Sequence, residues 1–236
     1  MARYEIPQDS AFATPFAGAE RVSAFLRAVY GWMCAGLAIT AATAWFIAGS
    51  PALVTAIAAN RVLFWALVIA QLGIVFVLSA RVQRLAPSTA SLLFIVYSAL
   101  TGLTISFVFL AFTNESVATT FLVTAGMFGA LAMYGTVTRR SLAGFGQFLF
   151  MGLIGLVLAS IVGMFWHSDA LQFLITIVGV IVFTGLTAWD AQRLKQMALT
   201  LPDGQAGAYA VVGALSLYLN FVNLFLMLLR LQGRRD

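Results

Sequence analysis

Long apolar runs alternate with short connections that hold nearly all of the charge. Seven stretches contain no Asp, Glu, Lys or Arg, and each has at least 19 residues: 28–60, 62–80, 85–114, 116–138, 141–168, 170–189 and 204–229. A membrane-spanning helix needs about 20 such residues. The stretches lack the strict apolar–polar alternation of membrane strands, so they predict helices. We place the spans at 28–48, 62–80, 90–112, 118–138, 147–166, 171–192 and 209–229.

Composition extends this pattern to the whole chain. Hydrophobic residues make up 62% of the sequence and charged residues only 9%, whereas soluble domains carry about 25% charged residues. We therefore predict an all-α integral membrane protein, a seven-transmembrane helix bundle formed by residues 21–236. Residues 1–20 are polar and predict a flexible cytoplasmic tail, and they lack the early apolar core of a signal peptide. The lipid bilayer is the expected surrounding.

The positive charges predict the orientation. With alternating spans, one side receives nine basic residues: Arg3, Arg21, Arg27, Arg81, Arg84, Arg139, Arg140, Arg193 and Lys195. The other side receives Arg61, so the amino terminus is predicted to be cytoplasmic. This dispersed charge also argues against binding to nucleic acid. Seven full spans place Arg230, Arg234 and Arg235 outside, whereas a last segment that dips in and returns would keep them inside; we favour seven spans.

Asp190 is the one acid that interrupts an apolar run well inside a predicted helix. It follows twenty uncharged residues, and a charge at the bilayer centre costs about 3 kcal/mol on insertion scales. If the sixth helix continues to about residue 196, Asp190 lies about two turns inside its cytoplasmic end. One interpretation is a helix-end carboxylate that pairs with Arg193 or reaches water. The other is a gating or ion-binding carboxylate that faces the bundle interior.

The seventh segment carries polar residues at helical spacing. Ser216, Asn220 and Asn223 share one helix face. Amide groups are unsatisfied in lipid, so this face is predicted to point into the bundle. It either bonds neighbouring helices as packing contacts, each worth about 0.6 kcal/mol, or lines a polar path past Asp190.

Other polar residues of the spans have simpler explanations. Tyr97, Ser98, Thr101 and Thr104 of the third segment are expected to bond carbonyls of their own helix. Arg81 and Arg84 end the second helix on the cytoplasmic side, as orientation anchors or as partners of a carboxylate at the same depth.

Catalysis and cofactors are not expected. Cys34 is the only cysteine and His167 the only histidine, so neither a disulfide nor a zinc motif is available. His167 is predicted in an outer turn, where it is too far from a membrane-embedded serine to act as its base. Neither a metal nor another cofactor is predicted.

Three segments resemble the Bax inhibitor-1 family, the transmembrane Bax-inhibitor-motif proteins. The run GALSLYLNFVNLFLMLLR at 213–230 is similar to the family's last helix, and TAWDAQ at 187–192 to the end of its sixth helix. Tyr134-Gly135 and the following TRRSL at 138–142 resemble its basic loop between helices four and five. The resemblance extends over about 22–233 and favours the bacterial branch.

The resemblance implies a bundle with the last helix central, located in a bacterial inner membrane. It also implies calcium leak across membranes, protection against cell death in eukaryotes, or modulation of a membrane-bound AAA protease. In bacterial relatives two aspartates of helices six and seven share a proton, and a basic residue at the end of helix two latches onto the first. Asp190 matches the first aspartate, and Arg84 or Arg81 matches the latch.

The sequence departs from that pattern at position 220, where Asn replaces the second aspartate. An Asp–Asn pair holds one titrating group and offers a divalent cation one negative charge, which weakens both pH gating and calcium conduction. Our leading hypothesis is a cation (calcium) leak channel regulated through Asp190, with Asn220, Asn223 and Ser216 along the pathway and protons as another permeant ion. The alternative is a non-conducting modulator of a membrane-bound AAA protease. A solute transporter is disfavoured, because repeats and broken helices are not evident.

Overall fold

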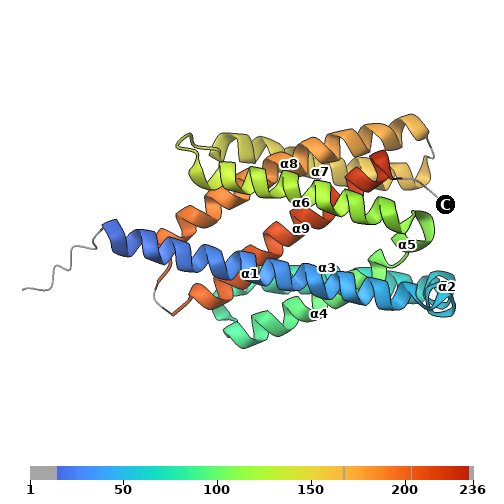
Figure 1. Ribbon diagram of the computed structural model, residues 1–236, viewed down its shortest axis with the longest axis horizontal. Coiled ribbons are helices and arrows are strands. Elements are labelled where there is room, and N and C mark those ends of the chain that lie inside the picture. Colours follow the sequence, from blue (N-terminus) through green and yellow to red (C-terminus); the bar gives the residue numbers. More distant parts are fainter. Residues whose placement is uncertain (1–14, 167, 203, 234–236) are drawn as a thin grey trace, which may run out of the picture.

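The computed structural model describes residues 15–166, 168–202 and 204–233, and all regular structure in these ranges is helical (Figure 1). The predictions made for residues 1–14, His167, Arg234 and Arg235 lie outside these described ranges. The elements are α1 (Pro15–Ala48), α2 (Pro51–Ala59), α3 (Arg61–Ala80), the 3-10 turn η1 (Val82–Arg84), α4 (Pro87–Ile105), α5 (Val108–Ala111), α6 (Asn114–Val137), α7 (Ala143–Phe165), α8 (Asp169–Thr200) and α9 (Ala206–Gln232).

Seven of these helices are long and apolar enough to cross a membrane: α1, α3, α4, α6, α7, α8 and α9. Each of them overlaps one of the seven predicted spans, so the predicted fold class is confirmed. The last is a single unbroken helix from Ala206 to Gln232. A last segment that dips in and returns is therefore wrong for the described chain.

Most helices are a few residues longer than the predicted spans, and two helix ends extend well beyond them. Helix α1 begins at Pro15, so residues 15–20 of the predicted tail are helical, while the prediction for 1–14 lies outside the described residues. Helix α8 continues to Thr200. Asp190 consequently lies about three turns inside the end of its helix, deeper than the sequence suggested.

Two short helices differ from the predicted connections. Helix α2 fills the segment after Gly49, with Pro51 in its first turn after the N-cap Ser50, a position where proline fits a helix because its missing N–H needs no partner. The predicted span 90–112 is interrupted after Ile105. Ser106 Oγ donates to Leu103 O at 2.7 Å, and such bonds to the helix's own carbonyls bend helices.

Helix α9 occupies the centre of the bundle, as the resemblance implied. It packs against α1, α4, α6 and α8, and it runs diagonally between a group formed by α1, α3 and α4 and a group formed by α6, α7 and α8 (Figure 1). Of its most apolar stretch 67% is buried, compared with 6% for α3. A helix surrounded by neighbours needs no polar outer face, which explains its apolar sequence.

Large apolar side chains cover the outside of the described bundle. Trp45, Phe76, Met151 and Phe165 are each more than 70% exposed. A soluble protein rarely exposes so much contiguous apolar surface. The outside of the bundle therefore suits lipid rather than water.

Several basic residues gather at one end of the bundle, where the α3–α4, α6–α7 and α8–α9 connections lie together. We call this the basic end; it contains Arg81, Arg84, Arg139, Arg140 and Lys195. Lys195 Nζ donates to Thr136 O at 2.7 Å, which joins α8 to α6 there. The opposite end contains α2, α5 and the start of α8 (Figure 1).

Two glycines bring neighbouring helices close to α8. A Cβ at Gly135 of α6 would collide with the backbone of Ala188, and a Cβ at Gly146 of α7 would collide with the indole of Trp189. Both contacts lie immediately before Asp190. The sequence thus holds α8 between α6 and α7 at the point where its acid faces α9.

Candidate functional site

The Asp190 carboxylate is buried between α8 and α9. Its side chain is 5% exposed. Asp190 Oδ2 accepts hydrogen bonds from Ser216 Oγ at 2.7 Å and from Asn220 Nδ2 at 2.8 Å. Hydrogen bonds to an ionised group are stronger than neutral ones. The structure thus brings together three of the residues that the sequence singled out.

Asn223 does not join this cluster. It lies on the same face of α9, but its Nδ2 donates to Leu219 O of its own helix at 2.8 Å. The polar stripe of the seventh span therefore divides in two. Ser216 and Asn220 bond the acid across the helix interface, whereas Asn223 satisfies its own backbone.

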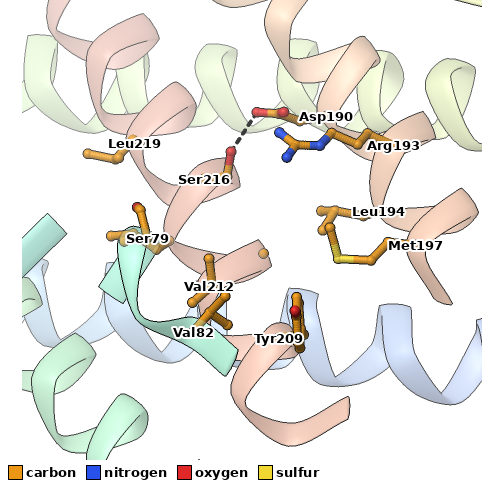
Figure 2. A pocket seen from close by; sticks show the side chains of 12 residues that line it. Ser79, Val82, Asp190, Arg193, Leu194, Met197, Tyr209, Val212, Ser216 and Leu219 are labelled. Atoms are coloured by element: carbon orange, nitrogen blue, oxygen red, sulfur yellow. Dashed lines mark hydrogen bonds between the residues drawn. The ribbon is translucent and has the colours of Figure 1, made fainter. Parts of the chain in front are cut away.

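A cavity of about 260 Å³ opens next to Asp190 on the side of the basic end. Its wall includes Ser79 at the end of α3, Val82 of η1 and Tyr209 at the start of α9. Figure 2 shows Asp190 and Ser216 at one side of this cavity and Val82 and Tyr209 at another. Asp190 thus lies at the inner limit of a cavity bordered by α3, η1, α8 and α9.

Arg193 is the cation that lines this cavity. Its side chain is exposed, and its guanidinium carbon lies 5.5 Å from the centre of the Trp189 ring. Arg81 and Arg84 are exposed and do not belong to the described cavity wall. The latch role of Arg84 or Arg81 therefore stays a prediction, whereas Arg193 lines the same cavity as Asp190.

Gln192 was quoted from the sequence without a role, and the structure supplies one. It is 7% exposed. Its Oε1 accepts from Leu142 N at 2.8 Å, and its Nε2 donates to Arg140 O at 2.9 Å. One side chain thus ties the basic α6–α7 connection to α8, two residues beyond Asp190. The only feature of the sequence that could have indicated this role is an amide side chain inside the predicted sixth span.

The comparisons with known proteins match nearly the whole chain. The family described as "Inhibitor of apoptosis-promoting Bax1" matches residues 22–236. The chain belongs to the Bax inhibitor-1 family. It is 49% identical over 232 residues to the inner membrane protein YbhL of Escherichia coli K12, covering 97% of this chain and 98% of that protein. Uncharacterised proteins of Borreliella burgdorferi and Deinococcus radiodurans are each 42% identical, over 213 residues (89% of this chain and 92% of that protein) and 218 residues (92% and 93%).

This Bax inhibitor-1 family protein contains a second buried polar cluster, which the sequence did not predict. Tyr218 is fully buried and points to the opposite face of α9 from Asn220, because two residues turn a helix by about 200°. Its hydroxyl lies 2.6 Å from Thr40 Oγ1, which also donates to Ser98 O at 2.9 Å. The cluster joins α1, α4 and α9 and anchors the central helix from its other side.

The hydroxyls of the third span mostly bond their own helix, as predicted. Ser98 Oγ donates to Phe94 O, Thr101 Oγ1 to Tyr97 O and Thr104 Oγ1 to Thr101 O, each at 2.9 Å. These side chains consequently stabilise α4 locally and do not form a separate polar path.

A second cavity lies at the opposite end of the bundle. It measures about 750 Å³, and its wall includes Asp169, Gln172, Thr176 and Arg230. Along α9, this wall and the wall of the Asp190 cavity are separated by 220–229. The buried side chains of Phe183, Leu224 and Leu228 form part of the apolar packing there. The two cavities are thus divided by an apolar barrier.

Because Ser216 and Asn223 bond different partners, replacing each of them with alanine should change the free energy of unfolding by different amounts. Ser216→Ala deletes a donor to a buried carboxylate, and we expect it to lower the free energy of unfolding by about 1–3 kcal/mol. Asn223→Ala deletes only a bond to its own helix and is the matched control. Thermal denaturation of the purified protein in detergent measures both variants. An Asn223→Ala protein as destabilised as Ser216→Ala would contradict this division of the stripe.

Proposed function

We propose that this protein is a cation leak channel of a bacterial inner membrane, regulated through Asp190 between α8 and α9. Calcium and protons are the candidate permeant ions, and the activity is transport rather than catalysis. The location is supported by YbhL, which is named an inner membrane protein. The amino terminus is proposed to be cytoplasmic, because the connections of the basic end carry most of the positive charge.

The observation that carries the proposal is the buried carboxylate beside a cavity. An acid inside a membrane helix is costly and marks an ion or proton path in many membrane proteins. Asp190 is 5% exposed, and it borders a cavity that also contains Arg193 and Ser216. Both donors from α9 reach Oδ2, so Oδ1 takes part in neither bond. One oxygen of the carboxylate is therefore not used by these contacts with α9.

The apolar barrier supports a channel that is closed in this structure. Beyond Asn220, α9 presents Phe221, Leu224 and Leu228 to the core, and each is at most 7% exposed. Phe221 packs edge-to-face against Phe128 of α6, with ring centres 5.5 Å apart. Apolar constrictions stop ions by excluding water. Conduction would need this layer to open or to hydrate between the two cavities.

The role of Asp190 is tested by two substitutions that change the charge of the cluster. Asp190→Asn removes the one acid among the described residues of this cluster, and we expect it to change cation flux from liposomes by about tenfold. Asn220→Asp places a second acid within hydrogen-bond distance of the first, and two such groups share a proton. Its flux should depend more steeply on pH than that of the wild type between about pH 5 and 8.

Calcium and proton fluxes into liposomes that contain each purified variant measure these effects. Asn223→Asp is the matched control, because Asn223 bonds Leu219 O and not Asp190. If the wild type and both Asp190-cluster variants leak at the rate of empty liposomes, the channel proposal is wrong. The non-conducting alternative would then take its place.

The apolar barrier gives a second test. Leu224 is fully buried in the layer between the cavities, and Leu224→Asn introduces an amide that attracts water there. We expect the resting cation flux to rise by about tenfold, because the layer would hydrate more easily. The exposed Leu122 of α6 supplies the control variant Leu122→Asn. Folded Leu224→Asn protein with wild-type flux would place the barrier elsewhere.

A further inference from the structure

We infer that Arg193 sets the ion selectivity of the Asp190 cavity, so that monovalent cations pass in preference to calcium. The inference rests on the channel proposed above and concerns the same site. Three features support it: Arg193 lines the cavity, Trp189 holds its side chain, and its positive charge offsets the negative charge of Asp190.

Trp189 positions the Arg193 side chain. The indole lies against the backbone of α7 at Gly146, where a Cβ would collide with it. The guanidinium carbon lies 5.5 Å from the centre of this ring, within the range of an attractive cation–π contact. Since Arg193 follows Trp189 by four residues and Asp190 by three, one side of the helix holds all three.

The Arg193 side chain is exposed, and it lines the cavity beside Asp190. Figure 2 shows it beside the Asp190 carboxylate, on the side that faces Leu194, Met197 and Tyr209. An arginine that only anchors a helix end extends toward lipid headgroups. Arg193 instead forms part of the wall between Asp190 and the basic end.

The charges in the cavity wall cancel. Asp190 is the one acid and Arg193 the one base among the described residues that line it. The groups from the other elements are neutral at pH 7: Ser79 of α3, Val82 of η1, and Tyr209 and Ser216 of α9. Asn220, the second donor to Asp190, is also neutral. When Asp190 is ionised, an entering ion therefore meets a site with no net charge.

Such a site suits a monovalent cation better than calcium. Calcium takes six to eight oxygen ligands, and carboxylates usually provide several of them. This cluster offers one carboxylate, one hydroxyl and one amide. Without Arg193, the charge of Asp190 would attract a divalent cation twice as strongly as a monovalent one at the same distance. Arg193 offsets this attraction, and the few oxygen ligands of the cluster do not compensate calcium for its loss.

The test compares calcium and potassium flux through the same reconstituted preparations. Arg193→Gln removes the charge but keeps a polar side chain, and we expect the calcium-to-potassium flux ratio to rise by roughly tenfold. Arg193→Lys keeps the charge and should keep the wild-type ratio. Arg139→Gln removes an equal charge from the exposed α6–α7 connection at the same end, and it should also leave the ratio unchanged.

Asn220→Asp provides an independent arm in case Arg193→Gln does not fold. At about pH 8, above the range in which the two acids share a proton, it adds a negative charge to the same cluster from α9 and should raise the ratio as well. An unchanged ratio in folded Arg193→Gln or Asn220→Asp protein, with both ions still flowing, would overturn the selectivity inference and leave the channel standing. Absence of any flux above empty liposomes in all variants would instead overturn the channel, and the inference with it.

Discussion

The hydrogen bonds that α9 gives to one buried carboxylate connect the fold of this protein to its proposed function. Ser216 and Asn220 both reach Asp190 Oδ2, at 2.7 Å and 2.8 Å. A buried charge needs such partners, because an unpaired one would shift to its neutral form or draw water into the bundle. The most buried helix thus supplies the donors, and the neighbouring helix supplies the acid. Tyr218, on the other face of α9, fixes the same helix to α1 and α4 through Thr40.

The surroundings of α8 hold the acid in place. Gly135 and Gly146 let α6 and α7 approach α8 at Ala188 and Trp189, and Gln192 bonds the α6–α7 connection on the next turn. These contacts fix the helix on both sides of Asp190. Mobility within the site is therefore expected in α3, of which only 6% is buried, and in η1, which contributes Val82 to the cavity wall.

Much of the fold followed from the sequence because the bilayer imposes one strong constraint, namely about 20 apolar residues for each crossing. The seven spans, the inward face of Ser216 and Asn220 and the local bonds of the α4 hydroxyls could all be predicted in this way. The break after Ile105 and the length of α8 could not, because they depend on hydroxyl bonds and on packing between helices. Asn223 shares the periodicity of Asn220 yet bonds its own helix, a difference that spacing cannot reveal. The resemblance pointed to Arg84 or Arg81 as the latch, which stays a prediction, while the structure adds Arg193 to the cavity wall, because only coordinates show which of several cations on one side of a membrane lies near the acid.

Carbodiimide labelling of the reconstituted protein tests the central claim, that a carboxylate sequestered between α8 and α9 controls the flow of cations. A hydrophobic carbodiimide enters apolar sites, and its adduct on Asp190 would remove the charge and fill the cavity. Peptide mass spectrometry and cation flux are then measured on the same samples. The account predicts that Asp190 reacts with the hydrophobic reagent, resists a water-soluble one, and that flux falls in proportion to its modification. Complete modification of Asp190 with unchanged flux, or equally fast labelling by the water-soluble reagent, would contradict it.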